Sequence, residues 1–194
     1  MSDFQLYFSL GREHILDVNG YDHILFVIAL SAVYLATDWK KVLVLVTAFT
    51  IGHSVTLAMV ALDVFRVNSS VVEFLIPVTI FITAVCNIWK RDQYISTDRS
   101  RLNYYFALFF GLIHGMGFSN YLKALLGKET SIVTQLFAFN IGLEVGQVII
   151  VVGFMGLGYL MNKYINVSRR DWILAISSAV AGVAITLMID TKFW

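Results

Sequence analysis

The sequence is poor in charged residues and has almost no cysteine or proline. Only 14% of its 194 residues are charged and 58% are hydrophobic, whereas a soluble domain has about 25% charged residues. The mean hydropathy is +0.76. The one cysteine, Cys86, excludes an intramolecular disulfide, and a net charge of +1 gives no sign of nucleic-acid binding. The composition therefore predicts an integral membrane protein whose surroundings are the lipid bilayer.

Apolar segments of membrane-spanning length recur along the chain. A spanning helix needs about 20 mostly apolar residues, and polar breaks divide the sequence into six candidates. They cover residues 21–37, 42–65, 71–89, 104–122, 131–160 and 171–190. We therefore expect an all-α integral membrane protein, a bundle of six transmembrane helices forming a single domain over residues 1–194. Residues 3–17 mix apolar and charged side chains and predict a short amphipathic or re-entrant element.

Lysine and arginine are distributed unevenly over the predicted breaks. The breaks at 37–41, 90–103 and 161–170 together hold nine, and the remaining breaks and the two chain ends hold five. Because cytoplasmic segments carry the excess of these residues, we expect the first set to be cytoplasmic. Both termini would then lie outside.

All four histidines fall within, or just before, an apolar segment. His53 lies eleven residues into its predicted span and His114 ten residues into its own, which is about 15 Å deep in a hydrocarbon core about 30 Å thick. His23 lies at the start of the first span, after Asp22, and His14 precedes it. Ionisable side chains at such depths usually mark a functional site or pathway.

Polar side chains also occur on the segments without histidine. Asn140, Glu144 and Gln147 are spaced so that they share one helical face, and Glu144 should point inward to a partner or a cation. Segment 71–89 adds further polar residues. The supporting polar positions are Glu73, Asn87, Asn140 and Gln147.

Several imidazoles with carboxylates and at most one sulfur donor suit a borderline divalent metal. Asp22 beside His23 could accept the second ring N–H of a metal-bound histidine. Plainer explanations exist for single residues. A histidine can simply join two helices by a hydrogen bond, His14 can lie at an interface, and Glu73 can be favoured by the dipole at a helix start.

Five stretches carry a resemblance to a known family. They are "GREHILDVNGYDHILF" (11–26), "FTIGHSVTL" (49–57), "VEFLIPVTIFITAVCN" (72–87), "FGLIHGMGF" (110–118) and "FNIGLEVGQ" (139–147). In this order the chain resembles the HupE/UreJ family of bacterial membrane proteins, mostly described as nickel permeases that serve hydrogenase and urease maturation. Seven residues separate His14 from Asp22, against five in the better-described permeases, so the chain resembles a divergent branch.

The resemblance implies the bacterial cytoplasmic (inner) membrane and a divalent transition metal as the substrate, with nickel first and cobalt or another divalent ion next. The positions that it implies are His14, Asp22, His23, His53, Glu73, Asn87, His114 and Glu144.

Three hypotheses follow. In the first, the protein is a metal permease in which His14, Asp22 and His23 collect the ion at the outer mouth. Near the middle of the membrane, His53, His114 and Glu144 would then bind it. In the second, the protein is an intramembrane zinc-dependent hydrolase in which three histidines, Asp22 and Ser54 hold zinc and activate a water. In the third, it is a membrane accessory protein stabilised by a metal.

Overall fold

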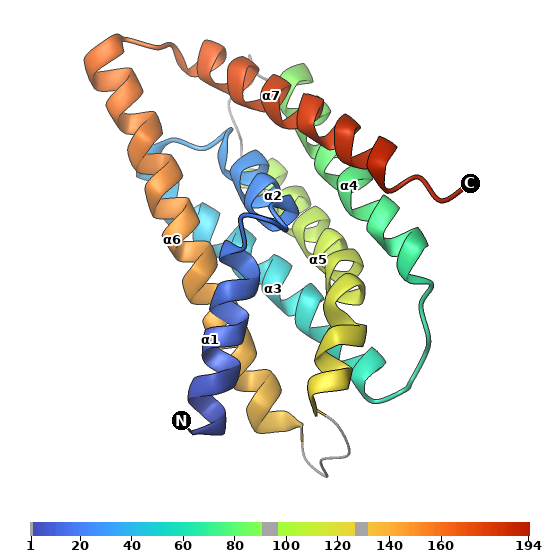
Figure 1. Cartoon of the computed structure of the whole chain (residues 1–194). Helices are drawn as coiled ribbons and strands as arrows, with labels where there is room; N and C mark the ends of the chain where they lie inside the picture. Colours follow the sequence, from blue (N-terminus) through green and yellow to red (C-terminus); the bar gives the residue numbers. More distant parts are fainter. Residues whose placement is uncertain (1, 91–96, 127–131) are drawn as a thin grey trace.

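The computed structural model describes residues 2–90, 97–126 and 132–194, and no strand occurs among them. The elements are α1 (Asp3–Leu16), α2 (Asp22–Ser31), the 3₁₀ helix η1 (Ala36–Asp38), α3 (Trp39–Ala61), α4 (Ser69–Trp89), α5 (Thr97–Leu126), α6 (Val133–Ile165) and α7 (Arg169–Asp190). Figure 1 shows them as a bundle in which α7 runs beside α4 and α1 runs beside α6. The predicted all-α class is confirmed.

Four helical segments of the described chain are long and apolar enough to cross a membrane. They are Ala36–Ala61, Ser69–Trp89, Val133–Ile165 and Arg169–Asp190. The predicted count of six is therefore not confirmed. The segment 104–122 lies within α5, which has 30 residues but carries polar side chains, including His114, along its length. The segment 21–37 contains only the ten-residue α2, which is too short to span a bilayer alone.

An interrupted helix pair, α1 and α2, takes the place of the first predicted span. The predicted N-terminal helix is present as α1, which begins at a capping box of Ser2 and Gln5 and packs along α6. The helix ends at Leu16 because the Asp17 carboxylate accepts the N–H of Asn19 at 2.9 Å in a local turn. The 14 and 10 residues of the two helices give about 36 Å of helix. Figure 1 shows α2 continuing beyond α1 along the bundle.

Glycines bring α3 and α5 into close contact. A Cβ added at Gly52 would overlap the carbonyl oxygen of Leu108, and one at Gly111 would overlap the carbonyl oxygen of Phe49. Small residues on both helices thus let the two backbones touch. His53 directly follows one of these glycines, so this crossing sets where its imidazole lies.

A second glycine crossing joins α1 to α6. A Cβ at Gly11 would overlap the carbonyl oxygen of Phe139, and one at Gly142 would overlap the carbonyl oxygen of Phe8. His14 lies one helical turn after Gly11 on α1. Both tight crossings in the bundle therefore carry a histidine next to the contact.

Candidate functional site

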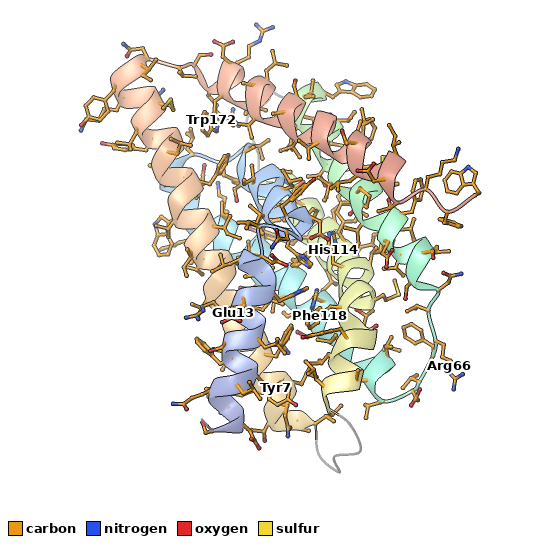
Figure 2. The ribbon with its side chains drawn as sticks, in the orientation of Figure 1. Tyr7, Glu13, Arg66, His114, Phe118 and Trp172 are labelled. Carbon is orange, nitrogen blue, oxygen red and sulfur yellow. The ribbon has the colours of Figure 1, made fainter. Side chains whose placement is uncertain are left out.

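The four histidines meet in the middle of the bundle, each from a different helix. The ring centroids of His14 (α1) and His23 (α2) are 4.5 Å apart. His53 (α3) is 5.9 Å from His14 and 5.8 Å from His23, and His114 (α5) is 5.3 Å from His23. Figure 2 places His114 in the interior of the bundle, near Phe118. We call these four side chains the histidine cluster.

The cluster departs from the predicted arrangement at two depths. His14 and His23 were expected at an outer mouth, with His53 and His114 deeper. The structure instead places His23 between the other three rings. The physical reason is the break after α1, which starts α2 inside the bundle, so that Asp22 and His23 lie at the depth of His53.

Two rings of the cluster have their Nδ1 atoms held by oxygen acceptors. His114 Nδ1 lies 2.9 Å from the carbonyl oxygen of Phe110, and His23 Nδ1 lies 3.1 Å from the Asp22 carboxylate. A carbonyl or a carboxylate can only accept, so Nδ1 carries the proton in both rings. The Nε2 atom of each neutral ring then presents a lone pair, which is the form of imidazole that binds metals.

Five of the other six ring nitrogens are buried and unsatisfied in the part of the chain that the structure describes. Among the described residues, no hydrogen bond is made by Nε2 of His14, His23 or His114, or by either ring nitrogen of His53. His53 and His114 are fully buried, and His23 is 4% exposed. Each unsatisfied buried polar group costs about 1–3 kcal/mol, so five of them in one place form an arrangement that a bound ligand would stabilise.

The spacing of the rings is close to that around a metal ion. Imidazoles bound at about 2.1 Å to a tetrahedral ion have ring centres about 5 Å apart, and the measured pairs span 4.5–5.9 Å. As they stand, however, no three His, Cys, Asp or Glu side chains of the described chain are arranged to hold a metal. Ring rotation within the cluster is needed to aim the lone pairs at one point.

Aromatic side chains enclose the cluster on two sides. The Phe118 ring lies 3.9 Å from His14 and stacks on Phe139 at 5.3 Å. On the other side, the rings of Phe26 and Phe49 lie 5.0 and 5.2 Å from His114. Such a shell excludes water and lowers the local dielectric constant, which strengthens electrostatic interactions inside it.

Glu144 faces α3, and no hydrogen bond joins it to the histidine cluster in the described part of the chain. Its carboxylate accepts a hydrogen bond from the Thr47 hydroxyl, and one turn further along, Gln147 accepts from Thr50 at 2.8 Å. The shared face of Glu144 and Gln147 agrees with the sequence-based expectation, but both oxygens bind threonines. Asn140, one turn before Glu144, has a buried Oδ1 without a hydrogen-bond partner in the described part of the chain.

The other predicted side chains are not joined to the cluster by any observed bond. Glu73 is exposed on the first turns of α4. Asn87 donates to the carbonyl oxygen of Ala29 at 2.7 Å, which ties α4 to α2. The Ser54 hydroxyl donates to the carbonyl oxygen of Thr50 at 2.6 Å, an ordinary bond within one helix.

The sequence analysis assigned no role to the phenylalanines around the cluster or to Thr47. One signal for the aromatic shell was available, because Phe49 and Phe110 each precede a histidine by four residues. That spacing stacks the two side chains on one helical face. No comparable signal points to Thr47, because its partner lies on another helix.

A wide opening reaches the cluster from the α1 side. An open cavity of about 820 Å³ is lined by residues that include Glu13, His14, Asp17 and Tyr121. His14 thus borders both this vestibule and the buried cluster. Glu13 is paired with Arg12 at 3.7 Å, and the Asp17 carboxylate is exposed, apart from its turn bond.

These features define a multi-pass helical membrane protein with an imidazole cluster that opens to a vestibule lined in part by charged side chains. A model of the family described as "HupE / UreJ protein" matches residues 1–191. The chain therefore belongs to the HupE/UreJ family. No curated protein and no solved structure matches the chain significantly.

Proposed function

We propose that this protein is a permease for a divalent transition-metal cation, with nickel first and cobalt next. The histidine cluster is the observation that carries the proposal. It gathers the buried imidazoles of His23, His53 and His114 and the partly buried one of His14, all with unsatisfied nitrogens. Imidazole suits nickel, zinc, copper and iron. Membership of the HupE/UreJ family supports a role in metal transport.

Asp22 is the carboxylate that would offset the charge of the bound ion. Neutral histidines bring no negative charge, and a dication in a site of low dielectric constant needs some. Asp22 contacts His23 through a hydrogen bond, so its charge acts on the cluster through the ring. Glu144, which was the second candidate, is bound to Thr47, so we place it outside the metal-binding set.

The vestibule would supply the ion to the cluster. The side chains of Arg12, Glu13 and Asp17 line it. Because Arg12 pairs with Glu13, Asp17 leaves these three groups with a net negative charge, and negative charge at the mouth of a cleft raises the local concentration of cations. His14 would take the ion first, since it borders both spaces. On the opposite side, Phe26 and Phe49 close the cluster, so release requires these rings to move.

Uptake of radioactive nickel into proteoliposomes tests the permease. The wild type should accumulate nickel, and the double variant His53→Ala/His114→Ala should fall to the level of empty liposomes, because two of four imidazoles are lost. Ser177→Ala is a matched control, since Ser177 is buried on α7 and its loss should leave uptake unchanged. Equal uptake by the wild type and the double variant would show that the cluster is not a transport site.

The zinc-hydrolase alternative draws on the same cluster. Three histidines and an open position would suffice for catalytic zinc, but the Ser54 hydroxyl is bonded to Thr50 and is not positioned by a ring nitrogen. An enzyme or a metal-stabilised accessory protein should retain nearly one zinc per chain through purification, whereas a permease should exchange its ion. Measurement of the metal content of the purified protein, before and after dialysis, separates these cases.

A further inference from the structure

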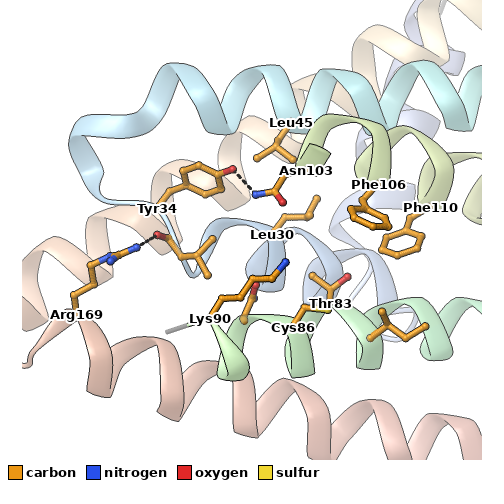
Figure 3. Close-up of a pocket in the computed structure, with 13 residues that line it drawn as sticks. Leu30, Tyr34, Leu45, Thr83, Cys86, Lys90, Asn103, Phe106, Phe110 and Arg169 are labelled. Atoms are coloured by element: carbon orange, nitrogen blue, oxygen red, sulfur yellow. Dashed lines mark hydrogen bonds between the residues drawn. The ribbon is translucent and has the colours of Figure 1, made fainter. Parts of the chain in front are cut away.

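A second site lies at the other end of the bundle, away from the vestibule. A cavity of about 120 Å³ is bounded by α2, α4, α5 and the start of α7, and Figure 3 shows its lining. Apolar side chains, among them Leu30, Ile82 and Phe106, make up most of its wall. We call it the α4–α5 pocket. No residue of the proposed metal site lines it.

Two cations, from different parts of the chain, line the α4–α5 pocket. Figure 3 shows Lys90 extending its ammonium toward the middle of the pocket, and Arg169 reaching in from α7. No Asp or Glu is among the described residues that line it, and no salt bridge of Lys90 occurs in the described part of the chain. The cations therefore face an apolar pocket without a counter-charge from these residues.

Arg169 adds an unpaired donor to the lining of the pocket. Its Nη2 donates to the carbonyl oxygen of Val33 at 2.9 Å, which holds the guanidinium in place. Its Nε is buried, yet it has no hydrogen-bond partner among the described residues. A buried donor of a charged group is costly to leave unpaired, and a guanidinium pairs best with a phosphate or a carboxylate.

A neutral phenol, that of Tyr34, also lines the α4–α5 pocket. The Tyr34 hydroxyl accepts a hydrogen bond from Asn103 at 3.1 Å, and burial raises the pKa of Tyr34 to about 12. The phenol therefore keeps its proton at physiological pH and can donate it. The polar part of the pocket lining therefore offers hydrogen-bond donors and positive charge, which suit an anionic ligand.

The other side of the α4–α5 pocket opens onto the apolar surface between α4 and α5. Ile82 is 45% exposed and Phe106 is 46% exposed, so a hydrocarbon chain can lie against both. Lys90 and Arg169 flank the ends of two candidate spans, Ser69–Trp89 and Arg169–Asp190. That is the level of lipid headgroups, and basic pockets between transmembrane helices bind anionic headgroups there.

We propose that the α4–α5 pocket binds an anionic phospholipid. The phosphate would pair with Lys90 and Arg169, and one acyl chain would lie along Ile82 and Phe106. A free inorganic phosphate could use the cations but would leave the apolar side of the pocket uncovered, so the lipid is the better fit. The proposal is independent of metal transport.

The only cysteine of the chain offers a direct test, because Cys86 lines the pocket and is exposed. The protein is reconstituted in nanodiscs of phosphatidylcholine, with or without phosphatidylglycerol, and alkylation of Cys86 by N-ethylmaleimide is followed by intact mass. Phosphatidylglycerol should slow alkylation severalfold. Lys90→Gln and Arg169→Gln should each remove most of this protection.

Lys40→Gln is the matched control. Lys40 stacks on Trp39 outside the pocket, so this change removes the same charge and should leave the protection in place. Equal alkylation rates in the two kinds of nanodisc would overturn the proposal, as would equal protection in the wild type and Lys90→Gln. Protection by inorganic phosphate in phosphatidylcholine alone, matching that of phosphatidylglycerol, would show an anion site and also overturn the lipid assignment.

Discussion

Asp22 and His23 show how a carboxylate can prepare a neighbouring imidazole for a metal. The carboxylate holds Nδ1 of His23 at 3.1 Å and also accepts the His23 backbone N–H at 2.9 Å. Both bonds fix the ring at the start of α2 and leave Nε2 buried without a partner among the described residues. A carboxylate in this position makes the imidazole a better ligand. Glu144 offers a contrast, since its bond to Thr47 keeps it on the α3–α6 contact.

Replacement of Asp22 by Asn should therefore weaken metal binding. Asn keeps an oxygen acceptor of the same size but removes the charge, and loss of such a partner typically costs about 10–100-fold in metal affinity. Calorimetric titration of the purified protein with Ni²⁺ measures the change. Glu144→Gln is the control and should bind nickel nearly as the wild type does. A larger loss in Glu144→Gln than in Asp22→Asn would contradict the assignment of Asp22.

Among the elements, α3 and α5 owe their contact to glycines, and the cluster depends on this contact. Gly52 and Gly111 each face a backbone oxygen of the other helix, so the helices approach as closely as backbones allow. His53 and His114 enter the cluster from this pair. Other glycines, such as Gly153 on α6 and Gly182 on α7, have nothing within 4 Å of an added Cβ. Position, and not glycine content, sets the crossing.

Gly52→Ala should destabilise the protein. The new methyl group would overlap the carbonyl oxygen of Leu108, and overpacking of this kind costs about 1–3 kcal/mol, which exceeds the gain of about 1 kcal/mol from better helix propensity. Thermal unfolding in detergent, followed by size-exclusion chromatography, measures the shift. Gly153→Ala should be neutral or slightly stabilising, because that position is open. Equal stability of the two variants would argue against a tight α3–α5 crossing.

The sequence predicted the helical class and the residues of the cluster better than their arrangement. Imidazoles in apolar segments are rare, so all four histidines stood out without a structure. The break after α1 was predicted, because residues 3–17 and 21–37 were separate elements in the sequence. Hydropathy, which averages over a window, merged α2 with the turn after it. No pattern showed that α1 packs along α6 inside the bundle, which brings His14 and His23 next to His53. The partner of Glu144 could not be predicted either, because no periodicity on α6 reveals which helix faces it.

At the scale of the whole molecule, successive helices run in alternating directions once α1 and α2 are counted as one interrupted crossing. Figure 1 shows α1 and α2 running the same way along the bundle, with α3 returning. Two bonds tie one end together: Arg169 at the start of α7 donates to Val33 after α2, and Asn103 on α5 donates to Tyr34. These contacts gather the described parts of the lysine- and arginine-rich segments, which are residues 37–41, 90, 97–103 and 161–170, at one end of the molecule.

We expect this end to face the cytoplasm, with both termini on the opposite side. The excess of nine Lys and Arg over five favours it, because positively charged segments are retained inside. Two reporter fusions test the orientation. One is a fluorescent protein that folds only in the cytoplasm, and the other is alkaline phosphatase, which is active only outside. At Trp194 the phosphatase should be active and the fluorescent fusion dark, and truncation at Asn166 should reverse both signals. Fluorescence of the fusion at Trp194 would instead show the opposite orientation. The vestibule of Glu13 and Asp17 would then open to the cytoplasm, as expected of an exporter.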